Sequence, residues 1–417
     1  MKIKVYPSVL TGTIDAVPSK SLSHRALIAA GLATGKSQLF KLLEAEDIKA
    51  TKNALLTLGV KLNKTSITGG NLHVNHDVID AKESGSTLRF MIPIALLLSQ
   101  AVTFIGHGKL PERPLGVYED LFLEAFHYNN PPKTLPLTVK GPLKAGTYKV
   151  RGDVSSQFIS GLLFALPLCQ GNSIIKLTSS LQSKDYVSMT IDVLKRANVT
   201  IIENDEEFII PGNQSYQPFS MTIEGDYSQA AFFLVAGCIS QTIAVRNLSS
   251  QSKQGDRAIV DILKAMNGTI VYDGDFTYRT SPSQTKGTLI DLKDIPDLGP
   301  ILMVLAALSE GTTNFKNTER LKLKESDRLE AMITILKQFG VPITLKSDTL
   351  SIQGVGSLKG NQSFSGYNDH RIVMALSIAA LKADGPIIIE GAEAINKSYP
   401  SFFDDYKSLG GTIEINQ

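Results

Sequence analysis

Residues 226–240 read DYSQAAFFLVAGCIS, an aspartate followed by apolar and small side chains without a further charged residue. An aspartate in this place can accept hydrogen bonds from the free backbone N–H groups in the first turn of a helix. Apolar side chains on every side of a helix, rather than along one stripe, are typical of a buried helix. The stretch therefore predicts a buried helix that begins near residue 226.

The same design occurs six times along the chain. Each copy opens with Ser or Asp, continues as an apolar run, and starts 65 to 72 residues after the copy before it. The copies begin at Ser19, Ser84, Ser155, Asp226, Asp297 and Asp369. A constant period of this length predicts six copies of one supersecondary unit.

A second series of segments repeats with the same period. Each is an amphipathic stretch that reads as the end of a helix, and successive ends lie 68 to 73 residues apart, at Gly59, His127, Asn198, Asn267, Gly340 and Gly410. A short apolar run such as 242–248 lies between the two helices of a unit, and a β pair such as 341–354 follows the second helix. Each unit is therefore predicted to be helix, strand, helix, strand, strand.

Six such units in 417 residues exceed one hydrophobic core, so we expect two domains of three units each. The chain starts with a strand-like segment, KIKVY (2–6), and ends with another, TIEIN (412–416). We expect these two strands to pair, which places the N-terminus with the C-terminal half of the chain. The fold class is α/β (α+β), with two similar domains built around buried helices.

The composition excludes several classes of protein. Lys and Arg number 42 and Asp and Glu 40, and a net charge of +2 argues against a nucleic-acid coat or a polybasic membrane binder. Cys169 and Cys238 sit in apolar runs, and the six histidines lack metal-ligand spacing, so we expect no metal. Neither a hydrophobic N-terminal segment nor an apolar run of about 20 residues is present, which predicts a cytoplasmic protein with no membrane or nucleic-acid partner.

The starts of the apolar helices carry unusual residues, most of them polar or cationic. A buried helix N-terminus attracts anions, and added Arg or Lys makes a phosphate or carboxylate site. The alternative is that Ser and Asp only cap helices. The residues concerned are Lys20, Ser21, Arg25, Gly85, Ser86, Arg89, Ser155, Ser156, Gln157, His370 and Arg371.

Three further segments could take part in chemistry. In KESDR (324–328), Lys324 and Arg328 are four residues apart and would share one face of a helix, with Glu325 beside them. A carboxylate held among cations keeps its charge and can move protons. Arg113 lies in the polar loop GKLPERPLG (108–116), and Lys397 lies in INKSYPSFF (395–403). The alternatives are an exposed helical ion pair, a surface turn and a solvated lysine.

Taken together, these motifs resemble the EPSP synthase (5-enolpyruvylshikimate-3-phosphate synthase) family over nearly the whole chain. The resemblance rests on eleven motifs in the family's order: SKSLSHRA, ESGSTLR, PERPLG, GDVSSQFISGLL, SKDY, EGDYSQAAFF, QGD, IPDL, LKLKESDRL, YNDHRIVMA and INKSYPSFF.

The resemblance implies two domains, each of three βαβαββ units. Residues 1–19 and 225–417 would form domain I, on the phosphoenolpyruvate side. Residues 20–224 would form domain II, on the shikimate 3-phosphate side. The implied enzyme is a 3-phosphoshikimate 1-carboxyvinyltransferase of the shikimate pathway, which leads to chorismate and the aromatic amino acids. It would need no cofactor or metal, act as a monomer and close its domains on substrate.

The resemblance also assigns residues to the two anionic substrates. Shikimate 3-phosphate would be held by Lys20, Ser21, Arg25, Ser155, Ser156, Gln157, Ser183, Tyr186, Asp297 and Lys324. Phosphoenolpyruvate would be held by Lys20, Gly85, Arg113, Gln157, Arg328, Arg371 and Lys397. Asp297 is the candidate for the proton of the 5-hydroxyl, and Glu325, assisted by Lys20 or Lys324, for the proton on the methylene carbon.

Departures from the family pattern and two alternatives remain. Residues 83–90, ESGSTLRF, differ from the usual family loop, so the sequence leaves glyphosate sensitivity open, and Arg320 replaces an Asn that contacts shikimate 3-phosphate in some members. The sister enzyme that acts on UDP-N-acetylglucosamine usually carries a Cys in the loop that corresponds to 106–116, and none is present here. A non-catalytic anion-binding protein would not need Asp297 and Glu325 together.

Overall fold

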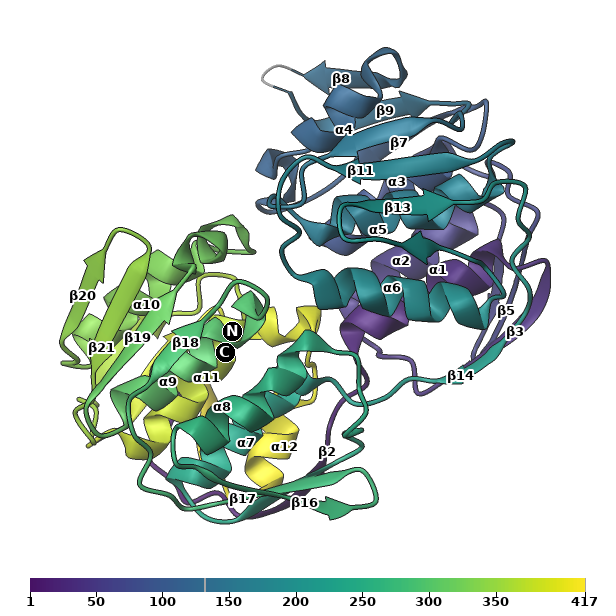
Figure 1. Cartoon of the computed structure of the whole chain (residues 1–417). Helices are drawn as coiled ribbons and strands as arrows, with labels where there is room; N and C mark the ends of the chain where they lie inside the picture. The colour runs from purple at the N-terminus through teal and green to yellow at the C-terminus, as the bar shows by residue number, and fades with distance from the viewer. Residues whose placement is uncertain (131–132, 417) are drawn as a thin grey trace. The chain divides into compact units, whose positions relative to one another are not determined.

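The computed structural model describes residues 1–130 and 133–416, and the chain forms two compact units (Figure 1). Unit 1 comprises Met1–Val17 and Glu224–Gln417, and unit 2 comprises Pro18–Ile223. Each unit contains three four-stranded sheets among its described residues. The α/β class and the sixfold repeat predicted from the sequence are therefore confirmed.

Unit 2 surrounds three inner helices with sheets and outer helices. The inner helices are α1 (Lys20–Leu32), α3 (Gly85–Ala95) and α5 (Ser156–Ala165). The outer helices are α2 (Glu46–Thr57), α4 (Gly116–Leu121) and α6 (Lys184–Arg196). The strands are β3 (Gly35–Phe40), β4 (Lys61–Asn63), β5 (Ser66–Gly69), β6 (Val78–Asp80), β7 (Ala101–Ile105), β8 (Phe126–Asn130), β9 (Thr134–Lys140), β10 (Thr147–Val150), β11 (Ser173–Leu177), β12 (Ile202–Glu203), β13 (Glu207–Ile210) and β14 (Ser220–Thr222).

Unit 1 has the same plan. Its inner helices are α7 (Tyr227–Ile239), α9 (Gly299–Ala307) and α11 (His370–Ala379). Its outer helices are α8 (Ile259–Ala265), α10 (Arg328–Gln338) and α12 (Phe402–Ser408). Its strands are β1 (Lys2–Val5), β2 (Gly12–Asp15), β15 (Ile243–Arg246), β16 (Thr269–Gly274), β17 (Thr277–Ser281), β18 (Leu289–Asp291), β19 (Thr312–Lys316), β20 (Ile343–Lys346), β21 (Thr349–Gln353), β22 (Gln362–Ser365), β23 (Ile387–Glu390) and β24 (Ile413–Asn416).

The sheets of both units share one pairing pattern. In each, a parallel pair is followed by two antiparallel pairs, as in the order β22-β23-β1-β24. The first strand of the chain, β1, pairs antiparallel with the last, β24, so that Ile3 lies opposite Ile415. The predicted pairing of the two terminal strands is therefore confirmed.

Two strands join a sheet of one unit and then lead into a helix of the other. Strand β2 precedes α1 in the chain, yet it pairs with β15 in unit 1. Strand β14 precedes α7, yet it pairs with β3 in unit 2. The chain thus passes from unit 1 to unit 2 after β2 and returns after β14.

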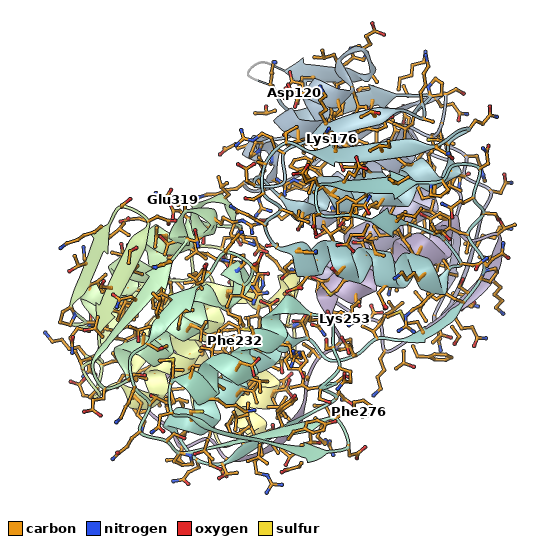
Figure 2. The ribbon with its side chains drawn as sticks, viewed as in Figure 1. Asp120, Lys176, Phe232, Lys253, Phe276 and Glu319 are labelled. Atoms are coloured by element: carbon orange, nitrogen blue, oxygen red, sulfur yellow. The ribbon has the colours of Figure 1, made fainter. Side chains whose placement is uncertain are left out.

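The core of each unit lies around its inner helices. Every residue of α7, α9 and α11 is buried, as the all-round apolar pattern predicts. Phe232 in α7 is completely buried, whereas Phe276, between β16 and β17, is 53% exposed (Figure 2). No helix in the described part of the chain is long and apolar enough to cross a membrane.

One predicted helix end is wrong. The segment that ends at His127 was expected to be amphipathic helix, but α4 stops at Leu121 and His127 lies in β8. Alternating aromatic side chains favour the strand here, because Phe126 and Tyr128 lie opposite Val139 and Leu137 of β9.

Candidate active site

The inner helices of unit 2 are exposed only at their first turns. Among all residues of α1, α3 and α5, four are not buried: Lys20, Ser21, Ser86 and Gln157. The caps of these helices, Ser19, Ser84 and Ser155, each accept a backbone N–H from the first turn. The accessible parts of the inner helices are therefore the N-termini, where an anion is most favourably held.

Gly85, Arg113 and Gln157 converge in unit 2. A Cβ on Gly85 would lie 2.9 Å from Nη1 of Arg113 and 3.7 Å from Oε1 of Gln157. Arg89 donates from Nη1 to that same Gln157 oxygen at 2.7 Å, and Nε2 of Gln157 donates to Ser86 at 2.9 Å. Burial, together with the Arg113 charge, lowers the pKa of Arg89 to about 10, so the Arg89 guanidinium is cationic at neutral pH.

Two further cations of unit 2 are held at α1. Lys20 forms an ion pair with Asp47 of α2, with 3.1 Å between Nζ and Oδ2. Arg25 is 2% exposed, and burial lowers its pKa to about 10. Its guanidinium donates to the backbone carbonyls of Ser21 and Tyr186, at 2.8 and 2.9 Å, and to the Thr190 hydroxyl at 2.8 Å.

The predicted serines of unit 2 lie at the starts of helices. Ser156 is the first residue of α5 and follows the capping Ser155. Ser183 precedes α6 in a left-handed conformation, with φ of 55°. Tyr186 lies in the first turn of α6, and its ring is 5.8 Å from the Arg25 guanidinium carbon. The ten candidates in residues 20–186 thus lie at or beside helix starts of unit 2.

In unit 1, Asp297 is surrounded by three cations. Its Oδ1 lies 3.1 Å from Nζ of Lys324 and 2.9 Å from Nη1 of Arg328, and its Oδ2 lies 3.2 Å from Nη2 of Arg371. Burial opposes ionisation of this carboxyl, but the charges of the three cations outweigh it and hold the pKa of Asp297 well below its usual range.

Asp297 does not cap an inner helix, and the cap predicted there is wrong. It lies in the short 3-10 helix η5 (Pro296–Leu298), and α9 begins at Gly299 without a side-chain cap. Pro296 favours this turn, because the backbone N–H of the first helical residue has no partner and proline lacks that N–H. The carboxylate is instead bonded to the three cations.

Arg328 and Asp369 form a buried pair beside Asp297. Nε and Nη2 of Arg328 donate to the two oxygens of Asp369, at 2.7 and 3.2 Å, and the two side chains are 2% and 0% exposed. Asp369 also caps α11 by accepting the backbone N–H of Arg371 at 2.9 Å. Burial opposes ionisation of Asp369, but the Arg328 charge helps to bring its net pKa below the usual value.

Lys324 and Arg328 do not share a helix face, contrary to the prediction from their spacing. Lys324 ends the 3-10 helix η6 (Thr318–Leu323), and Arg328 is the first residue of α10. They meet at the Oδ1 atom of Asp297 instead. Burial lowers the pKa of Lys324 to about 8, with Asp297 opposing the shift and the Arg320 and Arg328 charges adding to it.

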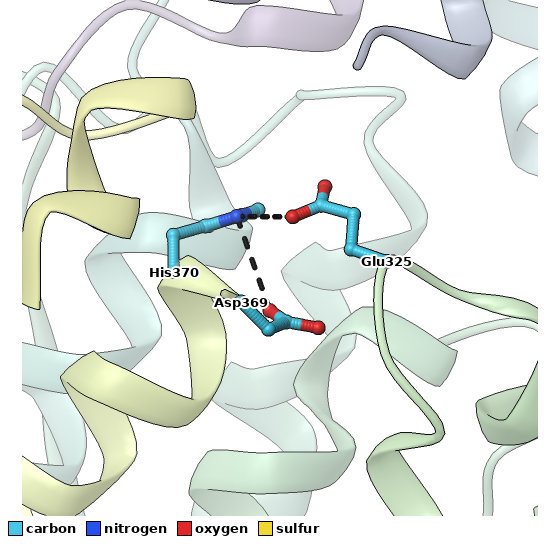
Figure 3. A group of neighbouring side chains, drawn as sticks. All are labelled: Glu325, Asp369 and His370. Carbon is cyan, nitrogen blue, oxygen red and sulfur yellow. Dashed lines mark hydrogen bonds and ion pairs between the residues drawn. The ribbon is translucent and has the colours of Figure 1, made fainter. Parts of the chain in front are cut away.

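Glu325 points toward His370, the first residue of α11 (Figure 3). Its Oε2 lies 2.9 Å from Nδ1 of His370, and that nitrogen lies 3.9 Å from Oδ1 of Asp369. These three residues are also the described group whose ligand atoms are close enough to share a metal ion. Because both Asp369 oxygens already accept hydrogen bonds from the Arg328 guanidinium, the arrangement favours proton handling over metal binding.

Lys397 completes the candidates of unit 1. It is 6% exposed and lies at the end of the 3-10 helix η8 (Ala392–Lys397). Its Nζ donates to the backbone carbonyl of Asn368 at 2.7 Å, next to the cap of α11. All six unit 1 candidates, Asp297, Lys324, Glu325, Arg328, Arg371 and Lys397, therefore lie near the starts of α9, α10 and α11.

A hollow of about 870 Å³ lies away from these groups, near the C-terminal ends of α7 and α9. Its hydroxyl groups are already engaged, since Thr285 pairs with Ser309 at 2.8 Å and Ser240 accepts the backbone N–H of Leu10. It presents no cluster of cations, so it is a poor candidate for an anion site.

Comparison with known proteins identifies the family. A family model described as "EPSP synthase (3-phosphoshikimate 1-carboxyvinyltransferase)" matches residues 5–406. The chain belongs to the EPSP synthase family. Relatives with the name 3-phosphoshikimate 1-carboxyvinyltransferase include one from Clostridium kluyveri, 46% identical, and one from Clostridium acetobutylicum, 45% identical. Both alignments cover 99% of this chain and 98% of the relative.

Solved structures share the EPSP synthase fold. An EPSP synthase from Acinetobacter baumannii has a TM-score of 0.83 at 24% sequence identity, and the alignment covers 100% of both chains. The enolpyruvyl transferase NikO from Streptomyces tendae has a TM-score of 0.79 at 13% identity, with 99% of this chain and 98% of that chain covered. At these identities the likeness shows the fold alone.

In this EPSP synthase family member, several residues contact the candidate cations of unit 1 or unit 2 but were not assigned from the sequence. Asp369, Ser228 and Asp47 each contact a candidate cation: Asp369 pairs with Arg328, Ser228 accepts from Arg371 and Asp47 pairs with Lys20. Asp369 carried a signal, since it opens an inner helix. Ser228 and Asp47 carried none that separates them from ordinary polar residues, because only folding brings them to their partners.

Proposed function

We propose that the chain transfers the enolpyruvyl group of phosphoenolpyruvate to the 5-hydroxyl of shikimate 3-phosphate, giving 5-enolpyruvylshikimate 3-phosphate and phosphate. Family membership and full-length relatives with the matching enzyme name support this reaction. The observation that carries it structurally is the convergence of Lys324, Arg328 and Arg371 on the carboxylate of Asp297. Such a group suits chemistry between two anions.

The residues proposed for shikimate 3-phosphate combine cations with hydroxyl groups. Arg25 is held by three hydrogen bonds, and Ser156 is the first residue of α5, where the helix dipole carries partial positive charge. A phosphate monoester is bound well by a fixed guanidinium and a helix N-terminus. The proposed set is Lys20, Ser21, Arg25, Ser155, Ser156, Gln157, Ser183, Tyr186, Asp297 and Lys324.

The residues proposed for phosphoenolpyruvate are richer in arginine. Its carboxylate and phosphate can each accept two parallel hydrogen bonds from a guanidinium. Gly85 supports this assignment, because a side chain there would meet Nη1 of Arg113 at 2.9 Å. The proposed set is Lys20, Gly85, Arg113, Gln157, Arg328, Arg371 and Lys397.

The proposed reaction is an addition followed by an elimination. Glu325 protonates the methylene carbon, which makes the neighbouring carbon electrophilic, and the 5-hydroxyl attacks that carbon while Asp297 accepts its proton. The tetrahedral intermediate then loses phosphate, and a proton leaves the new methyl group to restore the double bond. Lys20 or Lys324 would assist the transfer to and from Glu325, and the remaining cations stabilise the charge on phosphate.

To accept the proton of the 5-hydroxyl, Asp297 must become a stronger base during the reaction. Three cations hold its pKa well below the usual range, which makes it a weak base. A bound phosphate dianion beside Lys324, Arg328 and Arg371 would compensate their charges. The pKa of Asp297 would then rise, so substrate binding itself prepares the proton acceptor.

A phosphate-release assay with two acceptors tests the proposal. Phosphate should be released from phosphoenolpyruvate only when shikimate 3-phosphate is present, and mass spectrometry should find its enolpyruvyl ether. Release driven by UDP-N-acetylglucosamine would contradict the assignment. Activity that survives exhaustive chelation would support the proposed absence of a metal cofactor.

The proposal includes a monomeric enzyme of the cytoplasm. In the described residues each sheet is completed within one unit, which supports this part of the proposal. Sedimentation at micromolar concentration should give the mass of one 45.1 kDa chain. A stable dimer, or recovery of the protein in a membrane fraction, would contradict this part of the proposal.

A further inference from the structure

A buried tyrosine in α4 links the three segments of unit 2 that carry Gly85, Arg113 and Gln157. The hydroxyl of Tyr118 lies 2.9 Å from the backbone carbonyl of Arg89 in α3 and 2.9 Å from that of Phe158 in α5. The side chain is completely buried, and its ring packs edge-on against Phe158 with 4.8 Å between centroids. One phenolic proton is therefore shared between two inner helices.

The carbonyl of Arg89 lacks the partner that a regular helix would give it. In an α-helix, that carbonyl accepts from the N–H four residues later, and residue 93 is Pro93, inside α3. Proline has no N–H, and a buried carbonyl without a donor is costly. The Tyr118 hydroxyl supplies the donor that Pro93 cannot.

Gly161 leaves the space in which this bond forms. A Cβ at Gly161 would clash with both the Tyr118 hydroxyl and the Arg89 carbonyl, and would lie 3.3 Å from Cγ of Pro93. A glycine on α5 thus allows the tyrosine to reach α3. The bond from Tyr118 to the Arg89 carbonyl thus depends on one residue in each of three helices. Pro93 removes the competing donor, Tyr118 donates, and Gly161 leaves the space.

The bond is connected to the groups proposed to hold phosphoenolpyruvate through a short chain of contacts. The side chain of Arg89, whose carbonyl Tyr118 contacts, donates to Gln157 at 2.7 Å. Gln157 in turn donates to Ser86, next to Gly85 at the start of α3. Arg113 precedes α4 by three residues, so anchoring Tyr118 anchors the loop that carries Arg113.

We propose that Tyr118 is a positioning residue for phosphoenolpyruvate, acting through Gly85, Arg113 and Gln157. Its hydroxyl sets the placement of α4 against the starts of α3 and α5, and thereby the geometry of those three residues. The inference rests on the proposed function, and it adds to that function a residue that does not itself touch substrate.

The first experiment measures thermal unfolding and does not depend on activity. Tyr118→Phe removes the donor and should lower the melting temperature. In the Pro93→Ala background, the restored N–H at position 93 can serve the Arg89 carbonyl. In that background, Tyr118→Phe should lower the melting temperature by less than half as much as it does in the wild-type background. Equal losses in the two backgrounds would overturn the claim that the tyrosine replaces the missing proline N–H.

The second experiment separates positioning from stability. Tyr118→Phe should raise KM for phosphoenolpyruvate about tenfold, the loss expected for one hydrogen bond to a buried group. The turnover number and the dissociation constant for shikimate 3-phosphate should stay within about threefold. In Pro93→Ala/Tyr118→Phe, stability should recover while KM stays high relative to Pro93→Ala alone, because the link to α4 is still missing.

Tyr216→Phe is the matched control. Tyr216 is also completely buried in unit 2, and its hydroxyl also donates to an α5 carbonyl, that of Phe164, at 2.7 Å. That carbonyl lies near the C-terminal end of α5, so the control should lose stability but keep the wild-type KM. A KM for phosphoenolpyruvate that is unchanged in Tyr118→Phe, or raised equally in Tyr216→Phe, would overturn the proposal.

The remaining outcomes are also decisive. If Tyr118→Phe does not fold, the double variant with Pro93→Ala is measured in its place, and failure of that variant to fold contradicts the predicted rescue. If the wild-type chain shows no enolpyruvyl transfer, the proposed function fails. The thermal experiment still decides whether the Tyr118 bond exists.

Discussion

Arg371 donates two hydrogen bonds to Asp297, one to its carboxylate at 3.2 Å and one to its backbone carbonyl at 3.1 Å. The second bond anchors the backbone that bears the carboxylate, and the first fixes its orientation. Arg371 also donates to the hydroxyl of Ser228, near the start of α7, at 2.8 Å. One arginine therefore ties the starts of α7 and α9 to α11, the helix in which it lies.

Asp297→Asn should lower the turnover number by about 10² to 10⁴, because the amide keeps the shape but cannot accept the hydroxyl proton. The dissociation constant for shikimate 3-phosphate, measured by calorimetry, should remain measurable. A turnover number within threefold of wild type would contradict the role of Asp297 as proton acceptor.

Glu325→Gln should reduce turnover to a similar extent, about 10²-fold or more, because the amide cannot deliver a proton to the methylene carbon. The 2.9 Å contact with His370 can survive, since the amide oxygen still accepts a hydrogen bond. Exchange of the methylene protons of phosphoenolpyruvate with deuterated solvent, followed by NMR, should fall in parallel. Unchanged exchange would assign the proton to another group.

Binding of shikimate 3-phosphate should weaken as the pH rises through about 8. Burial lowers the pKa of Lys324 from 10.5 to about 8 in the folded chain, so the lysine is cationic below that pH and loses its charge above it. A bound anion stabilises the charged form and moves the transition to higher pH. Lys324→Arg should bind with little change between pH 7 and about 9.5, because an arginine keeps its charge there. The same pH dependence in both proteins would exclude Lys324 as its source.

Arg328→Met should destabilise unit 1 by about 3–5 kcal/mol, because it leaves the buried Asp369 carboxylate without its partner. The melting temperature should fall by roughly 10 °C for a domain of this size. The control is Arg246→Met: Arg246 pairs with Asp15 on the surface, with side chains 55% and 54% exposed, and it should cost less than about 1 kcal/mol. Equal losses of stability in the two variants would show that burial does not determine how much an ion pair contributes to stability here.

The repeat and the buried helices could be predicted because their causes are local. Apolar side chains all round a helix require burial wherever that helix lies, and Ser19, Ser84 and Ser155 cap their own helices. The prediction of a helix cap failed at Asp297, where groups distant in the sequence determine which partners the side chain has. Asp297 was expected to cap α9, but three cations from other segments of unit 1 engage its carboxylate.

The KESDR segment shows the same limit. A spacing of four residues puts Lys324 and Arg328 on one face only if the segment is helical, and α10 begins at Arg328. Their meeting point, Oδ1 of Asp297, lies 27 residues before Lys324 in the chain. No local pattern encodes such a contact.

By itself, the sequence determined the number of units, the burial of the inner helices and the cations at their starts. These follow from periodicity, hydropathy and capping, which act over one or two helical turns. Only the tertiary structure decided that β2 and β14 each join a sheet of one unit while leading into a helix of the other. It also decided that Tyr118 serves a carbonyl left without a donor by Pro93. Hydrogen bonds between distant segments select these partners, and they form only once the helices and sheets have packed.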